Sequence, residues 1–190
     1  MSSSFYAMLS RMKNIHRWGL MRNTRQENLS EHSLEVALIA HCLAVISNRR
    51  FGGELNADSI ATAALFHDTS EIITGDMPTP IKYYNADIKS TYKEIEKIAD
   101  NRLLDLLPED LREDFIPLYN PNEKEKRIIK AADKISALIK CVEELNMGNK
   151  EFAAAQKATL KSIEEMDMPE VRVFMEEFMP SFYLPLDEQI

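Results

Sequence analysis

The chain has 190 residues, of which 45% are hydrophobic and 28% charged, and its formal net charge is −8 at pH 7. This composition is typical of soluble globular material long enough to bury a core, and we expect residues 1–190 to form a single domain. The negative balance argues against nucleic-acid binding, which needs a broad basic face to neutralise phosphates. Only five glycines and eight prolines occur, which favours helix over strand and predicts an all-α fold.

Cysteine usage and apolar runs bear on the compartment. Cys42 and Cys141 each lie in an apolar helical pattern, and two such residues form no disulfide framework but indicate buried thiols in a reducing compartment. The N-terminus lacks the charged head and apolar core of a signal peptide. The longest apolar stretch, residues 36–46, is shorter than the roughly 18 residues of a membrane span. We therefore expect a cytoplasmic protein without membrane contact.

The N-terminal segment combines a helix with a basic loop. Residues 4–14 are predicted to form a short amphipathic helix, because apolar side chains recur at steps of three and four. Residues 15–27 lose this period and are expected to be irregular. Residues 11–25 carry five basic side chains and no acidic one. Such a segment in an acidic chain would attract a phosphate-bearing substrate.

Arg17 and Trp18 are the candidate substrate-binding residues of this segment. The guanidinium fork of Arg17 matches two phosphate oxygens better than an ammonium does, although an arginine in a basic loop is more often a solvated charge. Trp18 is the only tryptophan, and such a residue is more often core or a surface plug. Neither residue establishes a site by itself.

A second helix is predicted from Asn28 to about Asn48. Asn28 can cap it, with Glu31 three positions later in a capping-box spacing. His32 then falls in the first turn as a candidate metal ligand. The expected core stripe of this helix comprises Leu34, Leu38, Cys42 and Val45.

The central motif lies in residues 57–73, which are predicted to form one helix. Residues three and four positions apart share a helix face, so His67, Asp68 and Glu71 can face one pocket. Adjacent residues point about 100° apart on a helix, and His67 and Asp68 can therefore share an ion only if other ligands come from elsewhere.

The rest of the chain is expected to supply those ligands from further helices. Residues 74–80 should form a rigid loop carrying Asp76, because two prolines prevent continuation of the helix. Helices are predicted over 89–107, 123–147, 152–163 and 169–179, with 117–121 as a loop. Asp133 lies in the apolar stripe of one of them. An aspartate there is costly unless it is paired, for example with a nearby lysine, or bound to a metal.

The four candidate metal ligands occur along the chain in the order His32, His67, Asp68 and Asp133. This order resembles the HD-domain phosphohydrolase superfamily, in which two histidines and two aspartates on separate helices hold one divalent metal. The Arg17-Trp18 pair and the loop Gly75-Asp76-Met77-Pro78-Thr79-Pro80 make the chain similar to the bacterial 5′-deoxynucleotidases of that superfamily. The resemblance covers nearly the whole chain and implies a compact helical HD-domain fold.

The resemblance also implies an activity, the removal of the 5′-phosphate from 2′-deoxyribonucleoside monophosphates. In this pattern Arg17 orients the phosphate, and Trp18 packs where the 2′-hydroxyl of a ribonucleotide would lie. Glu71 is expected to protonate the leaving 5′-oxygen and Asp76 to position the water. The implied metal ligands are His32, His67, Asp68 and Asp133. The implied substrate contacts are Arg17, Trp18, His32, Asp68, Asp76, Thr79, Pro80, Ile81 and Lys82.

Several properties stay open at this level. Two imidazoles and two carboxylates without a thiolate suit one divalent Co, Mn, Zn, Fe or Mg ion, and the residues do not decide among these. Another HD phosphohydrolase, acting on nucleoside triphosphates or cyclic nucleotides, is one alternative, although no extra basic cluster for a triphosphate is obvious. A non-catalytic, metal-stabilised helical scaffold is the other. The apolar residues 174–182 and the resemblance together predict a homodimer.

Overall fold

The structure, a computed structural model, describes residues 2–190 except Tyr83, and the side chain of Thr79 also lies outside the described part. Within these residues the fold is all-helical, and extended backbone pairs only in an isolated bridge between His16 and Asn28. The predicted fold class is confirmed. The α-helices are α1 (Phe5–Leu9), α2 (Leu29–Phe51), α3 (Ala57–Phe66), α4 (Glu71–Thr74), α5 (Thr79–Lys82), α6 (Ala86–Leu104), α7 (Glu109–Tyr119), α8 (Glu123–Asn146), α9 (Ala153–Glu164) and α10 (Pro169–Glu177). Short 3₁₀ segments cover Ser10–Asn14, Lys150–Phe152, Met179–Tyr183 and Leu186–Glu188.

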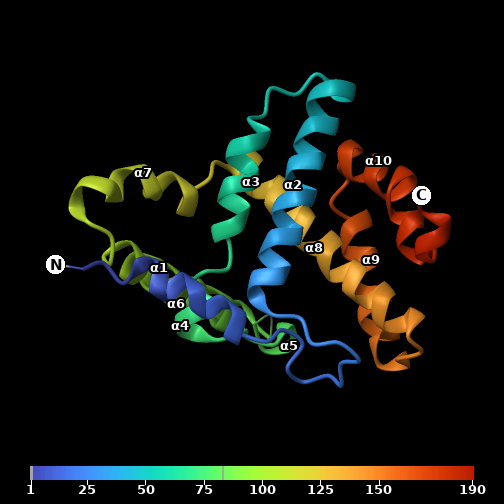
Figure 1. Cartoon of the computed structure of the whole chain (residues 1–190), viewed down its shortest axis with the longest axis horizontal. Helices are drawn as coiled ribbons and strands as arrows, with labels where there is room; N and C mark the ends of the chain where they lie inside the picture. The colour runs from blue at the N-terminus through green and yellow to red at the C-terminus, as the bar shows by residue number, and fades with distance from the viewer. Residues whose placement is uncertain (1, 83) are drawn as a thin grey trace.

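The helices are arranged around α2, which packs against α3, α8 and α10. Figure 1 shows α2 and α3 side by side at the centre, with α8 crossing behind them and α9 and α10 beyond α2. The short helices α1, α4 and α5 lie with α6 at the N-terminal end of α2, and α7 extends to the side (Figure 1). The start of α2, the end of α3 and the middle of α8 therefore come together.

Two hydrophobic clusters hold this arrangement. The larger one joins α2, α3, α8 and α10 around fully buried side chains such as Leu43, Ile60 and Ile135. The smaller one contains Phe5 and Leu103 and joins α1 to α6. Burying one large aliphatic or aromatic side chain contributes about 1.5–3 kcal/mol. Both clusters thus support the region where the predicted site residues lie.

The buried face of α2 differs from the predicted one. Leu34, Leu38 and Val45 are 57%, 66% and 38% exposed, whereas the opposite side is fully buried around Leu43. Cys42 is half-buried and packs against the larger cluster, but the rest of the predicted stripe was wrong, because both faces of α2 are apolar and periodicity alone cannot choose between them. Among the described residues, α2 is also the one helix whose length and composition would allow it to cross a membrane. More than half of that apolar window is buried inside the structure, as in a core helix.

The helix predicted over 57–73 is divided into α3 and α4. The backbone N–H groups of Thr69 and Glu71 donate to carbonyls three residues earlier, at 3.2 and 3.0 Å. The Thr69 hydroxyl donates to the same carbonyl as its own N–H, at 2.9 Å. These bonds form a tight turn, so His67 and Asp68 lie on a bend after α3 and not along one helix face.

Helix ends were predicted best where a cap marks them. Asn28 and Glu31 form the expected capping box at the start of α2, and an Asn122 box opens α8. The helix expected at 89–107 instead spans Ala86–Leu104, because Asn85 caps it.

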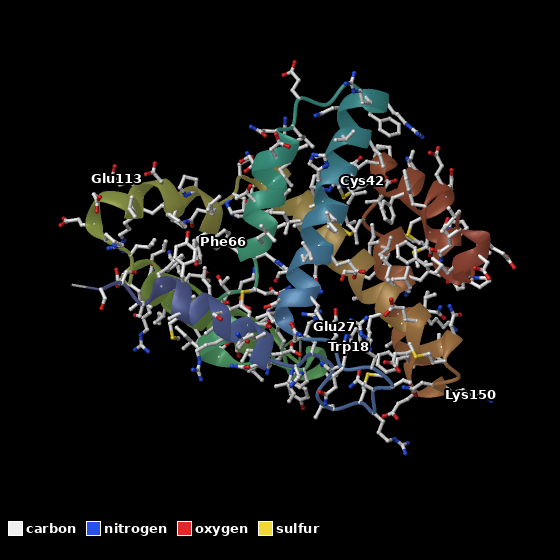
Figure 2. The ribbon with its side chains drawn as sticks, viewed as in Figure 1. Trp18, Glu27, Cys42, Phe66, Glu113 and Lys150 are labelled. Atoms are coloured by element: carbon white, nitrogen blue, oxygen red, sulfur yellow. The ribbon has the colours of Figure 1, made fainter. Side chains whose placement is uncertain are left out.

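Helix α7 was not predicted. Pro117, expected in a loop, lies in its last turn, and no residue of this charged helix is buried. It is held instead by aromatic contacts of Phe115, whose ring centroid is 5.3 Å from that of Phe5 and 6.2 Å from that of Phe66. Figure 2 shows Phe66 between α3 and α7.

Candidate metal centre

The four predicted metal ligands meet between α2, the α3–α4 turn and α8. One ligand atom from each of His32, His67, Asp68 and Asp133 lies within 4.8 Å of the others. His32 Nε2 is 3.2 Å from Asp133 Oδ1, and His67 Nε2 is 3.1 Å from Asp68 Oδ2. The fold therefore gathers two imidazoles and two carboxylates from three distant parts of the chain.

The Nδ1 atom of each histidine, on the side of the ring away from the centre, forms a hydrogen bond. His67 Nδ1 lies 2.7 Å from the Ala64 carbonyl and donates to it. His32 Nδ1 lies 3.1 Å from Ser136 Oγ, and the Ser136 hydroxyl in turn donates to Glu35 Oε2 at 2.5 Å. Because the Ser136 hydroxyl hydrogen is used in the bond to Glu35, Ser136 Oγ accepts a hydrogen bond from His32 Nδ1. In their neutral form both rings then carry their one proton on Nδ1 and would present the Nε2 lone pair to an ion at the centre.

These residues fit a divalent metal ion. The Nε2 atoms of His32 and His67 are buried and lack a hydrogen-bond partner, although buried polar atoms in proteins are nearly always satisfied. An ion between the two rings and the two carboxylates would satisfy both nitrogens. The donor set of imidazoles and carboxylates is one that borderline and hard divalent ions accept.

The charges at the centre shift the titration of its ligands. Burial opposes the charged form of His67, but the carboxylates of Asp68 and Asp133 raise its pKa to about 9. Burial acts to raise the pKa of Asp133, but the adjacent His32 imidazole lowers it overall. Since a ligating histidine is neutral, a metal ion would take the place of the proton on His67.

Arg17 is the one residue of the basic segment that reaches this centre. Its Nη1 is 3.5 Å from Asp68 Oδ2 and its Nη2 is 4.0 Å from Asp133 Oδ1. Arg22 and Arg25 pair instead with acidic side chains at the surface. The guanidinium of Arg17 therefore lies where a phosphate oxygen approaching the ligands would meet it.

Trp18 and Asp76 lie next to Arg17. Trp18 has a positive φ of 60°, and its indole ring packs against Phe152 with centroids 5.3 Å apart. A hydrogen bond from the Trp18 backbone reaches the Asp76 carboxylate. Burial raises the pKa of Asp76, an effect that Arg17 partly opposes. The loop after α4 and the loop after α1 are thus joined beside the centre.

Glu71, at the start of α4, is a buried carboxyl group only 4% exposed. Its Oε2 is buried without a hydrogen-bond partner. Burial, together with the negative charges of Asp68 and Asp76, raises the pKa of Glu71 to about 9. A carboxyl group in this state carries a proton at neutral pH and can donate it.

The remaining residues predicted to contact the substrate lie in the short helix α5. The Thr79 prediction falls on a side chain outside the described part of the chain. Pro80 and Ile81 are exposed, and Lys82 pairs with Glu96 at 2.7 Å. Among the members of this group whose side chains are described, Lys82 lines the same pocket as the metal ligands.

That pocket has a volume of about 430 Å³ and opens between α6 and α8. His67, Asp68 and Asp133 form part of its wall. Its lysines are Lys82, Lys89, Lys93, Lys126, Lys130 and Lys134. The sequence did not reveal this basic cluster, because its members are spread over three helices.

Three supporting residues were also missed. Glu35 and Ser136 hold His32 from behind, and Glu27 contacts Arg17 and Trp18. Ser136 follows Asp133 by three positions, a spacing that places both on one helix face. Glu27 lies in the irregular segment and carries no such signal.

Comparison with known proteins identifies the family. The family model described as 5′-deoxynucleotidase YfbR-like matches residues 4–182. The 5′-deoxynucleotidase YfbR of Salmonella paratyphi B is 53% identical over 189 residues, which cover 98% of this chain and 95% of that protein. The chain belongs to the YfbR-like 5′-deoxynucleotidase family. The resemblance inferred from the motifs is confirmed.

Solved structures place this YfbR-like chain in the HD-domain fold. An HD-domain phosphohydrolase from Listeria innocua aligns with a TM-score of 0.81 and 25% identity, over 94% of this chain and 88% of that one. The HD phosphohydrolase of cyanophage S-2L, solved bound to dA and one catalytic Zn²⁺ ion, aligns with a TM-score of 0.66 and 21% identity, over 93% and 95%. At that identity, the second likeness concerns the fold alone.

Proposed function

We propose that this chain is a metal-dependent 5′-deoxynucleotidase that converts 2′-deoxyribonucleoside 5′-monophosphates into deoxynucleoside and phosphate. The observation that carries the proposal is the convergence of His32, His67, Asp68 and Asp133 beside the guanidinium of Arg17. It occurs in a chain 53% identical, over nearly its full length, to an enzyme of that name. In this proposal, residues 1–190 of the chain form one HD domain. The protein acts in the cytoplasm.

The four ligands would hold one divalent ion, with Co, Mn, Zn, Fe and Mg all compatible with their chemistry. When bound, such an ion supplies Lewis-acid chemistry to a phosphate oxygen and to the attacking water. The protein keeps the ligands aligned through the bonds behind His32 and His67. His32 and Asp68, at the same centre, also border the phosphate.

Arg17 binds and orients the phosphate. Its Nη atoms already face the centre, and its side chain is only 13% exposed, so little water competes for them. Charge-assisted bonds from a guanidinium fork are strong and directional. They fix the phosphorus atom relative to the water that attacks it.

Proton movements are assigned to Glu71 and Asp76. Glu71, with its pKa raised to about 9 by burial and by neighbouring carboxylates, donates its proton to the leaving 5′-oxygen as the P–O bond breaks. Asp76, held by the Trp18 backbone, orients the attacking water. Glu71 and Asp76 therefore have different roles in catalysis, because their surroundings differ.

Trp18 discriminates between the two kinds of sugar, and α5 contacts the rest of the nucleotide. The indole of Trp18 fills the space beside C2′, so a 2′-hydroxyl meets a steric barrier. The residues of α5 at the substrate are Thr79, Pro80, Ile81 and Lys82.

A longer phosphate chain is the rival substrate, because six lysines line the pocket at the metal centre. A panel of deoxynucleoside mono-, di- and triphosphates, ribonucleotides and cyclic nucleotides, assayed for released phosphate with metal-loaded protein, separates these functions. Our proposal expects turnover of deoxynucleoside monophosphates only. Turnover confined to triphosphates or cyclic nucleotides would show that it is wrong.

The Glu71→Gln variant separates an enzyme from a scaffold. Glutamine is close in size but carries no acidic proton, so turnover should fall by about 10²-fold or more. Bound metal and thermal stability should stay at wild-type values. Full turnover in this variant would remove Glu71 from the mechanism, and absence of turnover in the metal-loaded wild type would favour the scaffold.

We further propose that the protein is a homodimer that pairs through α2. Its exposed leucines, Leu34 and Leu38, border a hollow of about 280 Å³ shared with Arg25, Glu31 and Glu35. An exposed apolar strip with charged borders is typical of a protein interface. The C-terminal segment suits this role less well, because Phe174 and Met179 are buried in the core.

A further inference from the structure

Glu27 is a buried carboxylate with contacts to three residues of the proposed site. Its Oε2 accepts a hydrogen bond from Trp18 Nε1 at 2.7 Å and lies 3.6 Å from Arg17 Nε. Its Oε1 lies 3.5 Å from His32 Nδ1. Figure 2 shows Trp18 and Glu27 together near the start of α2. One side chain thus touches the groups assigned to the sugar, the phosphate and the metal.

Glu27 is itself firmly placed. Its side chain is only 12% exposed, and its carbonyl accepts from the Arg17 N–H at 3.0 Å. The neighbouring bridge between His16 and Asn28 continues this pairing into α2. The segment before Trp18 and the segment after Gln26 are therefore clamped together, and the carboxylate extends from the clamp.

Trp18 needs such an anchor. A positive φ is uncommon for a bulky side chain, and Trp18 has a φ of 60°. Its ring also packs against Phe152, and packing of this kind does not fix rotation of the indole as a directional hydrogen bond does. The bond to Glu27 therefore determines which edge of the ring faces the sugar site.

Arg17 is oriented by the same carboxylate. Glu27 lies at the Nε edge of the planar guanidinium, while the two Nη atoms face Asp68 and Asp133. Because the group is rigid and flat, a charge at one edge sets the direction of the other. Without Glu27, the guanidinium could turn toward the surface.

We propose that Glu27 is a positioning residue that holds the Trp18 indole against the sugar and the Arg17 guanidinium toward the phosphate. Glu27 thereby sets the preference for deoxynucleotides through Trp18 and supports turnover through Arg17. The proposal rests on the deoxynucleotidase function proposed above.

Two substitutions separate these effects. Glu27→Ala removes the contacts to Trp18 and to Arg17. The ratio of kcat/KM for a deoxynucleotide to that for its ribonucleotide should therefore fall by about tenfold, part of the roughly 10²-fold that a steric pocket can supply. Glu27→Gln keeps an oxygen that can accept from the indole but removes the charge beside Arg17. Its ratio should stay at the wild-type value, while kcat falls by less than the roughly 10²-fold expected for loss of Arg17 itself.

Fluorescence gives a readout that is independent of activity, because Trp18 is the only tryptophan. Its emission maximum should move to longer wavelength in Glu27→Ala and stay in place in Glu27→Gln. Glu151→Ala is the matched control, since Glu151 pairs with Arg22 of the same loop and forms neither a hydrogen bond nor an ion pair with Trp18. Emission and ratio should both be unchanged in this control.

A double variant tests whether the sugar effect passes through the indole. Phenylalanine has no ring N–H, so in a Trp18→Phe background Glu27→Ala should change the ratio no further. The proposal is overturned if Glu27→Ala keeps the wild-type ratio and emission, or if the Glu151→Ala control changes them equally. If Glu27→Ala does not fold, wild-type kcat in Glu27→Gln overturns the proposal instead. Failure of the wild type to hydrolyse deoxynucleotides would remove the proposed function, while the emission shift would still report the Glu27 anchor.

Discussion

At the scale of single residues, Arg17 differs from the other basic residues of its segment by where its charge lies. It faces the metal ligands at 3.5 and 4.0 Å, whereas Arg22 is exposed and pairs with Glu151. Arg17→Ala should therefore lower kcat by about 10²-fold or more, because charge-assisted bonds to the phosphate strengthen in the transition state. Steady-state kinetics with a deoxynucleoside monophosphate measures this loss.

The Arg22→Ala variant is the control for that experiment. It removes a positive charge from the same segment without touching the centre, so kcat should stay within about twofold of wild type. Equal losses in both variants would mean that the net charge of the segment, and not the position of Arg17, governs turnover.

Replacement of Asp133 tests the proposed metal site by measuring metal uptake. Asp133→Ala removes one of four donors and leaves His32 Nε2 without its nearest carboxylate, at 3.2 Å. Metal content after dialysis should fall to background. A ligand present at 100 times its Kd stabilises a fold by about 2.7 kcal/mol, so added metal should raise the melting temperature of wild type but not of the variant. Asp58→Ala, at an exposed aspartate of α3, is expected to bind metal normally.

At the scale of elements, capped helices were predictable and the break in the motif helix was not. Asn28 with Glu31 marks the start of α2 by local chemistry, which tertiary structure did not alter. The turn before Glu71 has no proline or glycine to signal it. It forms because packing of α3 and α4 on different neighbours outweighs local propensity. The site order could be predicted, but the turn that presents His67 could not.

The loop between Trp18 and α2 is anchored by Glu144 of α8, which is fully buried. Its carboxylate accepts from the Thr24 backbone N–H at 2.9 Å and from Asn149 Nδ2 at 2.8 Å, and pairs with Lys140. Burial acts to raise the pKa of Glu144, but these donors lower it to about 2 from 4.5. A depressed pKa means that the ionised form stabilises the fold above pH 4.5, and that this contribution is lost as the pH falls toward 2.

Glu144→Gln should therefore destabilise the protein at pH 7 by up to about 3 kcal/mol, because each unit by which the pKa is lowered corresponds to about 1.4 kcal/mol. The difference from wild type should shrink as the pH is lowered below 4.5. Urea unfolding at pH 7 and pH 3 measures both values. A difference that is the same at both pH values would show that the charge of Glu144 is not the source of the stabilisation.

At the scale of the whole molecule, the exposed face of α2 determines the expected assembly. Leu38 is 66% exposed at the middle of this face. Leu38→Glu places a charge in the proposed contact and should convert a homodimer into a monomer, because burying an unpaired charge is costly. Sedimentation at micromolar concentration decides the outcome. A Leu186→Glu variant, which changes an equally exposed leucine near the C-terminus, should remain dimeric, whereas a monomeric wild type would rule the interface out.

The metal ligands could be predicted from the sequence, whereas the residues that support them could not, because their contacts form only in the folded protein. His32, His67, Asp68 and Asp133 carry their chemistry in their residue types and order, so the metal centre was predictable. Glu27 and Ser136 act through contacts made only after α2, α8 and the loop have packed. The lysines of the pocket likewise converge from separate helices. Such groupings depend on tertiary structure and have no local pattern.

The spread of the ligands along the chain has a consequence for unfolding. His32 and Asp133 come from the first and last thirds of the sequence, and His67 and Asp68 lie between them. An ion held by all four acts as a crosslink that closes two large loops in the chain. Because His32 lies on α2 and Asp133 on α8, separation of these two helices breaks the coordination of the ion. Loss of metal and loss of the central packing should therefore be one cooperative event.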